Sequence, residues 1–229
     1  MLSIIIPTLN EQETIAVTLS ALQPLRRHGV EVIVVDGDSN DDTMRLASPL
    51  SDLAIVAPRG RASQMNAGAR HAAGDNFLFL HSDTALPKGA IDAIERALLE
   101  GEAVWGRFDV GIESSLRLLT AVAFMMNLRS RWTGIATGDQ AMFVDRTTFE
   151  RIGGFPPILL MEDIALSKSL KRISRPACLR DKVTTSGRRW EKHGIISTVL
   201  LMWRLRFAYF LGADPSDLAE KYTHARRNA

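Results

Sequence analysis

Three short apolar runs in the first third of the chain each end in a polar, acidic segment. These segments are Pro7-Thr8-Leu9-Asn10-Glu11, DGDSNDDT at residues 36–43 and HSDT at residues 81–84. Short apolar runs predict buried strands, and ligands of open α/β sheets bind where the carboxyl ends of the strands meet. Carboxylates collected there suit a ribose, a base edge or a divalent cation that bridges phosphates. The pattern therefore predicts a site for a nucleoside diphosphate.

Strand and helix patterns alternate up to residue 110. The strands are predicted at 3–7, 30–35, 53–56, 76–80 and 103–110, and the helices at 11–23, 41–47, 61–73 and 90–100. Asn10 is the expected N-cap of the first helix. Repeated β–α units predict an α/β fold with a mostly parallel central sheet flanked by helices. Further along, we expect a strand at 141–145 and helices at 115–129, 147–152, 163–172 and 195–211.

Composition restricts the partners and the compartment. The 229 residues are 46% apolar and 24% charged, as in globular proteins with a substantial core, and the net charge of +2 does not suggest nucleic-acid binding. The single cysteine, Cys178, fits a reducing compartment, and no signal peptide is recognised. The apolar stretches at 118–128 and 194–203 are shorter than the ~20 residues of a membrane span. We expect a cytoplasmic protein, with contact at the inner membrane face as the further option.

Four motifs occur in a fixed order: IIIPTLNE at 4–11, VVDGDSNDDT at 34–43, FLHSD at 79–83 and MED at 161–163. With this order the chain resembles the family 2 glycosyltransferases over residues 3–190. GRASQMNAG at 60–68, GDQ at 138–140 and the histidine of the third motif resemble a short single-domain bacterial subgroup. The resemblance implies a Rossmann-like GT-A domain at 1–190, with a nucleotide-binding half at 1–110 and an acceptor half at 111–190. Residues 191–229 would form a helical C-terminal lobe.

The resemblance also implies a nucleotide-sugar donor and a divalent metal, Mn²⁺ or Mg²⁺. Asp36 can accept from the imide N–H of a uracil-like base, which favours UDP over GDP, and Arg61 can face the donor phosphates at a helix start. The alternatives are a turn-capping acid and a solvated arginine. The residues expected to bind the nucleotide-sugar are Pro7, Thr8, Asn10, Glu11, Asp36, Asp38, Arg61, Ser82, Asp83, Gly138, Asp139, Arg189 and Trp190.

The third motif departs from the family's D-x-D pattern because His81 replaces the first acid. Asp83 is the expected metal ligand, since one or two carboxylates suffice when diphosphate and water complete the shell. His81 would ligate the metal, with a preference for Mn²⁺, or hydrogen-bond the ribose. The alternatives are a structural histidine and, for Asp83, a helix cap.

The fourth motif supplies the expected catalytic acids, Glu162 and Asp163. The resemblance assigns the general base to Asp163, which would take the proton of the acceptor hydroxyl as it attacks the anomeric carbon. An N-cap role is the alternative for both acids. Asp139 would contact sugar hydroxyls, and Gly138 would let the backbone approach them closely.

The basic cluster Arg188-Arg189-Trp190 is similar to the family's Q-x-x-R-W element but lacks its glutamine, so processivity is not expected. The cluster can bind a diphosphate, stack on a sugar or form a surface patch. The apolar helix at 195–211 is expected to be core, a homodimer contact or a peripheral membrane contact that brings the enzyme to a lipid-linked acceptor.

Together these features predict a metal-dependent, inverting glycosyltransferase. Two alternatives stay open. One is a sugar-phosphate nucleotidyltransferase, although the first strand lacks the Gly-rich basic turn that would hold a triphosphate. The other is a non-catalytic nucleotide-sugar binding module, which the His81 replacement suggests.

Overall fold

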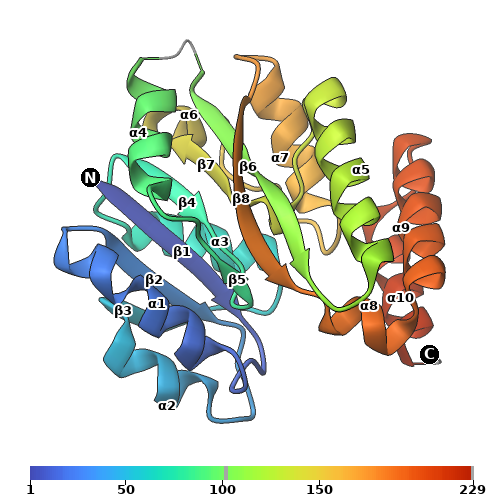
Figure 1. Ribbon diagram of the computed structural model, residues 1–229, viewed down its shortest axis with the longest axis horizontal. Coiled ribbons are helices and arrows are strands. Elements are labelled where there is room, and N and C mark those ends of the chain that lie inside the picture. Colours follow the sequence, from blue (N-terminus) through green and yellow to red (C-terminus); the bar gives the residue numbers. More distant parts are fainter. Residues whose placement is uncertain (101–102, 228–229) are drawn as a thin grey trace.

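One sheet runs through the computed structural model, which describes residues 1–100 and 103–227. Its strands are β1 (Leu2–Thr8), β2 (Glu31–Asp36), β3 (Leu53–Val56), β4 (Asn76–Phe79), β5 (Thr84–Ala85), β6 (Trp105–Glu113), β7 (Met142–Asp145) and β8 (Ala177–Ser186). They form an 8-stranded sheet of order β3-β2-β1-β4-β7-β6-β8-β5 (Figure 1). Strands β1 to β4 pair in parallel, β6 pairs in parallel with β8, and β7 and β5 pair antiparallel with their neighbours. The predicted α/β fold with a mostly parallel sheet is confirmed.

Helices cover both faces of this sheet. They are α1 (Ile15–Arg27), α2 (Thr43–Ala47), α3 (Arg61–His71), α4 (Ala90–Leu99), α5 (Arg117–Thr133), α6 (Arg146–Arg151) and α7 (Glu162–Lys171), with short 3₁₀ turns η1 (Ser48–Leu50) and η2 (Gly138–Gln140). Side chains alternate across β1: Ile4 and Ile6 pack with α1 and α4, whereas Ile5 packs with α3 and α7. Each face therefore has its own apolar core, and the polar strand ends are left at the edge.

The C-terminal residues form a separate lobe of α8 (Arg188–His193), α9 (Ile195–Phe210) and α10 (Pro215–Arg227), which lies beyond α5 and α7 in Figure 1. A third apolar cluster of Met161, Ile164, Leu205 and Leu218 joins α9 and α10 to the start of α7. Within the described residues, no helix combines the length and the hydropathy needed to span a bilayer.

Three predictions of secondary structure were wrong or incomplete. Asn10 does not cap a helix: it has a φ of 53°, and α1 starts at Ile15. The same helix continues through Pro24, where the sequence suggested an end. Strands β5 and β8 and helix α8 were not predicted, and α10 was covered only by the general expectation of a helical lobe at 191–229. In β8, the register against β6 jumps from Leu179 to Lys182, so the charged residues between them break the alternation that marks a strand.

Candidate active site at the carboxyl edge of the sheet

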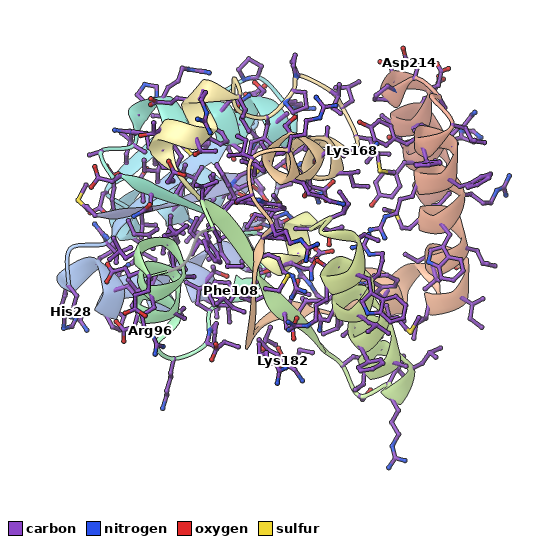
Figure 2. All side chains as sticks on the ribbon, turned by 90° about the horizontal axis from the view of Figure 1, so that it is seen from above. His28, Arg96, Phe108, Lys168, Lys182 and Asp214 are labelled. Atoms are coloured by element: carbon purple, nitrogen blue, oxygen red, sulfur yellow. The ribbon has the colours of Figure 1, made fainter. Side chains whose placement is uncertain are left out.

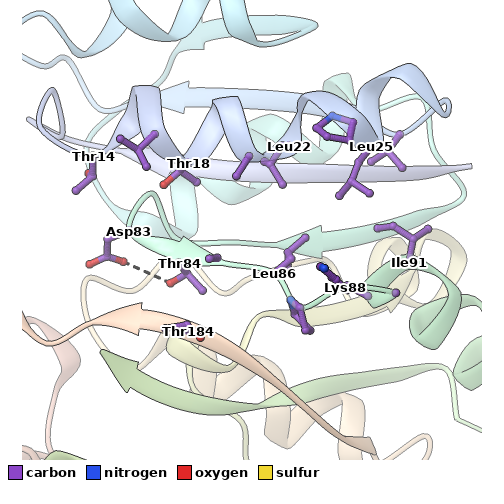
Figure 3. Close-up of a pocket in the computed structure, with 18 of the residues that line it drawn as sticks. Thr14, Thr18, Leu22, Leu25, Asp83, Thr84, Leu86, Lys88, Ile91 and Thr184 are labelled. Carbon is purple, nitrogen blue, oxygen red and sulfur yellow. Dashed lines mark hydrogen bonds between the residues drawn. The ribbon is translucent and has the colours of Figure 1, made fainter. Parts of the chain in front are cut away.

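Two hollows meet at Asp83, which lines both of them. The first, the α1–α4 groove, has a volume of about 820 Å³ and runs between α1, α4, β5 and β8. Figure 3 shows Asp83 at one end of it, below Thr14 and Thr18 of α1. The second, the α5–α9 cavity, has a volume of about 630 Å³ and is lined by α5, η2, the first turn of α7 and α9. The predicted site residues that line the second are Arg61, His81, Asp83, Gly138, Asp139, Asp163 and Trp190.

A tight turn links the histidine of the third motif to the acids of the fourth. The backbone N–H of Gly138 donates to Asp163 Oδ2 at 3.0 Å, and His81 Nδ1 lies 3.3 Å from Asp139 Oδ1. A Cβ at position 138 would lie 2.5 Å from His81 Nε2, so any larger residue there would displace the imidazole. The turn itself is fixed by a capping box between Thr137 and Gln140. Residues 81, 138, 139 and 163 thus form one connected unit.

The two acids of the fourth motif have different surroundings. Met161, with a φ of 69°, is the N-cap residue of α7, so both acids lie in its first turn rather than at the cap. Asp163 lines the α5–α9 cavity, whereas Glu162 is buried and lies 4.0 Å from Arg61. Burial, reinforced by the charge of Asp163 and opposed by Arg61, raises the pKa of Glu162 to about 7. The geometry therefore favours Asp163 over Glu162 as the acid that meets a bound molecule.

The raised pKa of Glu162 predicts a pH-dependent stability. The folded protein holds the Glu162 proton more tightly than the unfolded chain does. The contribution of Glu162 to the free energy of unfolding is therefore greatest below the ordinary pKa of 4.5 and is lost as the pH rises to about 7. Each unit of pKa shift is worth about 1.4 kcal/mol. We expect Glu162→Gln to raise the free energy of unfolding at pH 8 relative to wild type, and much less at pH 5. Urea unfolding at both pH values measures this, with the exposed Glu95→Gln as control. Equal effects of Glu162→Gln at both pH values would contradict it.

Asp83 and His81 fit a metal unequally. The contacts of the Asp83 carboxylate are Thr84 and Thr185 hydroxyls at 3.4 and 3.5 Å, the outer limit of a hydrogen bond, so its oxygens can take a cation. His81 is 12% exposed and faces Asp139. Among the described residues, no cluster of three or more His, Cys, Asp or Glu side chains could hold a metal ion. A cation here would depend on ligand oxygens and water in addition to Asp83.

The second motif forms an internally bonded loop. Buried Asp36 accepts hydrogen bonds from the Thr8 hydroxyl at 3.0 Å and from the Ser39 backbone N–H and hydroxyl at 2.7 and 2.6 Å. Asp41 accepts from the Thr43 N–H and hydroxyl, as expected of a capping acid, and bonding lowers its pKa although burial alone would raise it. Arg59 donates to the carbonyl oxygens of residues 37 and 38. Hydrogen bonds within the loop therefore fix the position of the Asp36 carboxylate.

The remaining predicted donor residues lie around this loop and the α1–α4 groove. Pro7 and Ser82 are buried, Asp38 is exposed in the second loop, and the Asn10 side chain accepts from the backbone N–H of Asn40. Glu11 lies 4.0 Å from Arg188, whose guanidinium also pairs with Glu13 at 2.6 Å. The side chain of Arg189 lies outside the part of the chain that the structure describes.

Four contributors were not identified from the sequence: Gln64, Arg129, Arg206 and Tyr222. Buried Gln64 donates to the carbonyl oxygens of Thr8 and Val35 and so joins the ends of β1 and β2. The other three line the α5–α9 cavity. The one sequence signal for Arg129 and Arg206 was an arginine that interrupts an apolar helix, which occurs in both α5 and α9.

A sequence model described as glycosyl transferase family 2 matches residues 3–155. A Bacillus subtilis (strain 168) protein, "Probable glycosyltransferase YdaM", is 28% identical over 190 residues, which cover 72% of this chain and 45% of that protein. An undecaprenyl-phosphate 4-deoxy-4-formamido-L-arabinose transferase of Yersinia enterocolitica is 29% identical over 148 residues, covering 60% of this chain and 45% of that protein. This chain therefore spans about half the length of these relatives.

Among solved structures, the mannosyltransferase PcManGT of Pyrobaculum calidifontis in complex with GDP-Man and Mn²⁺ is similar, with a TM-score of 0.62 and 24% identity. The similarity covers 98% of this chain and 68% of the other. It shows that the expected GT-A fold is correct.

Proposed function

Because the chain belongs to glycosyl transferase family 2, we propose that it transfers a sugar from a nucleotide-diphosphate sugar to an acceptor hydroxyl, with inversion at the anomeric carbon. The observation that carries this proposal is the position of Asp163. This acid lines a cavity together with Asp83, Arg61 and Asp139, and the Gly138 N–H holds its carboxylate in place.

For the donor we propose UDP, whose base would meet Asp36 and whose diphosphate would lie between Asp83 and Arg61. A carboxylate has more acceptor sites than the three that Thr8 and Ser39 use, so Asp36 can also accept from an imide N–H. A divalent cation, Mn²⁺ or Mg²⁺, would be held by Asp83, with His81 beside it, and would supply charge neutralisation of the leaving diphosphate. The PcManGT complex, whose nucleotide is GDP, supports a nucleotide-sugar donor and a divalent metal.

In the proposed step the acceptor oxygen forms a bond to the anomeric carbon while the bond from that carbon to the diphosphate oxygen breaks. The hydroxyl proton passes to Asp163, and the electron pair of the broken bond stays with the nucleoside diphosphate. Arg61 and the Gly138 turn would orient the donor, and Asp139 would accept from a sugar hydroxyl. The buried Glu162 is a supporting residue here.

Donor turnover tests this proposal against both alternatives. We expect slow, Mn²⁺-dependent release of UDP from a UDP-sugar, with water in place of the acceptor. Pyrophosphate release from UTP and a sugar phosphate would identify a nucleotidyltransferase instead. Binding of UDP-sugars without any hydrolysis or transfer would identify a binding module. Parallel assays with GDP-sugars test the nucleotide.

Recognition of the base is tested at Asp36. Asp36→Ala is expected to weaken UDP and UMP binding alike by about 1–3 kcal/mol, the range for leaving a buried polar partner unpaired. Calorimetric titration measures this. Ser39→Ala is the control, because it removes the 2.6 Å hydrogen bond to Asp36 but leaves the carboxylate. Wild-type UMP affinity in Asp36→Ala would make Asp36 a turn residue only.

A further inference from the structure

The wall of the α5–α9 cavity is apolar and open to solvent. Along α5 the lining includes Leu118, Val122 and Met125, and along α9 it includes Ile196, Leu200 and Trp203. Several of these are both cavity lining and strongly exposed: Ile196 is 68% exposed and Trp203 is 62% exposed. Apolar side chains gathered at a cavity mouth are typical of a binding surface rather than of a closed core. In Figure 2, α9 lies at the edge of the molecule, next to α5.

The apolar stripes on α5 and α9 each end in an arginine. On α5 the lining residues recur every three or four positions up to Arg129, and on α9 they include most of residues 195–203 and then Arg206. Both arginines line this cavity, and the charge of Arg206 lowers the pKa of Arg129. Asp163 lines the same cavity, and its charge also acts on Arg129. The cavity therefore brings together an apolar wall, an arginine pair and the proposed catalytic acid.

Neither arginine of this pair is neutralised. Arg129 Nε and Nη2 and Arg206 Nε are buried without a hydrogen-bond partner, and neither residue forms an ion pair with another described residue. By contrast, Arg107 and Arg131 both form ion pairs with the carboxylate of Asp109. Burial and the like charge of Arg206 lower the pKa of Arg129 to about 10. An anion bound in the cavity beside the two guanidinium groups would balance their charge.

We propose that the acceptor is an anionic amphiphilic alcohol. Its apolar chain lies between α5 and α9, its anionic group binds Arg129 and Arg206, and its hydroxyl reaches Asp163. This inference rests on the proposed function and extends it by naming the substrate class. The reaction is the displacement described above: the lipid hydroxyl oxygen bonds to the anomeric carbon, its proton goes to Asp163, and the nucleoside diphosphate leaves.

Short-chain phosphatidylglycerol, dissolved as monomers, is the probe for this site because it carries a chain, a phosphate anion and free hydroxyls. Calorimetric titration is expected to show binding, and incubation with a UDP-sugar and Mn²⁺ is expected to yield a glycosylated lipid by mass spectrometry. Dihexanoylglycerol lacks the anion, and glycerol 3-phosphate lacks the chain. Both should bind about 10- to 100-fold more weakly, the usual effect of losing a charge-assisted hydrogen bond or a buried chain.

Variants of the arginine pair make the test specific. Arg129→Gln and Arg206→Gln are each expected to weaken binding of the probe by about 10- to 100-fold. Arg129→Lys keeps the charge and should retain part of the affinity for the probe. It replaces Arg129→Gln as the test variant if Arg129→Gln folds poorly. The matched control is Arg204→Gln, an exposed arginine on α9 that does not line the cavity, and it should bind the probe as wild type does.

Several outcomes would overturn the inference while leaving the glycosyltransferase proposal intact. One is a wild-type protein that hydrolyses the UDP-sugar but does not bind the probe. A second is equal affinity for the probe and for either truncated compound. A third is a loss of probe affinity in Arg204→Gln as large as that in Arg206→Gln. Glycosylation of farnesyl phosphate, which has no hydroxyl, would make a phosphate oxygen the nucleophile. A stable dimer in sedimentation that excludes the probe would assign the apolar mouth to a second copy.

Discussion

Asp163→Asn is expected to lower turnover by about 10²–10⁴-fold, the usual contribution of general acid–base catalysis, with donor affinity unchanged. The carboxylate lines the cavity and is held by the Gly138 N–H at 3.0 Å, and an asparagine oxygen can still accept that bond. What is lost is the capacity to take a proton. UDP release from a UDP-sugar measures turnover, calorimetry measures donor affinity, and the acidic limb of the pH–rate profile should disappear with the carboxylate.

The neighbouring acid provides the control for this result. Glu162→Gln removes the neighbouring carboxyl group, at a buried position outside the cavity lining, and should reduce turnover far less. For Asp163→Ala, added acetate should restore part of the activity because a small carboxylate can replace the missing base. Wild-type turnover in Asp163→Asn would exclude this mechanism. If donor affinity falls together with turnover, Asp163 belongs to the donor site and Asp139 becomes the candidate base.

Asp83→Asn is expected to abolish the Mn²⁺-dependent part of UDP affinity and to reduce turnover by about 10³-fold. A Lewis acid supplies several kcal/mol of transition-state stabilisation, and each 1.4 kcal/mol is about a factor of ten in rate. The substitution should leave the melting temperature nearly unchanged, because the contacts of this carboxylate are two hydroxyls at 3.4 and 3.5 Å. Titration of UDP with Mn²⁺ and with EDTA separates the metal-dependent affinity.

Two further variants serve as comparisons for the effect of Asp83→Asn. His81→Ala should be milder, since diphosphate oxygens and water can complete a shell that Asp83 begins. Asp92→Asn changes an exposed acid that lines only the α1–α4 groove and should have no effect. Unchanged UDP affinity in Asp83→Asn with Mn²⁺ present would remove Asp83 from the metal site.

Local patterns predicted the parts of the fold that depend on nearby residues. The nearly continuous apolar runs of β1, β2 and β4 identified the buried strands, because a strand covered on both faces is apolar at successive positions. Strand β8 was missed because its pairing with β6 jumps at Leu179 and inserts charged residues into the pattern. Helix α1 was ended too early because Pro24 normally stops a helix, whereas here it is accommodated inside one.

For the candidate site, the motif order located the acids but not their surroundings. The assembly of His81, Asp139 and Asp163 around Gly138 was only partly foreseen, because it depends on a contact between residues 57 positions apart that no spacing rule encodes. The difference between Glu162 and Asp163 is likewise a matter of burial, which adjacent residues do not reveal. Arg129 and Arg206 were missed for the same reason: their shared cavity exists only once α9 packs beside α5.

Helices α9 and α10 pack through the small cluster of Met161, Ile164, Leu205 and Leu218 rather than through the two cores of the sheet. One wall of the α5–α9 cavity is thus anchored independently of the sheet and its two cores. Segments with few apolar contacts of their own open at lower free energy than the rest of a domain. During evolution, such a wall can be remodelled or replaced with little effect on folding. Relatives that share the donor half are therefore free to diverge in the molecules they modify.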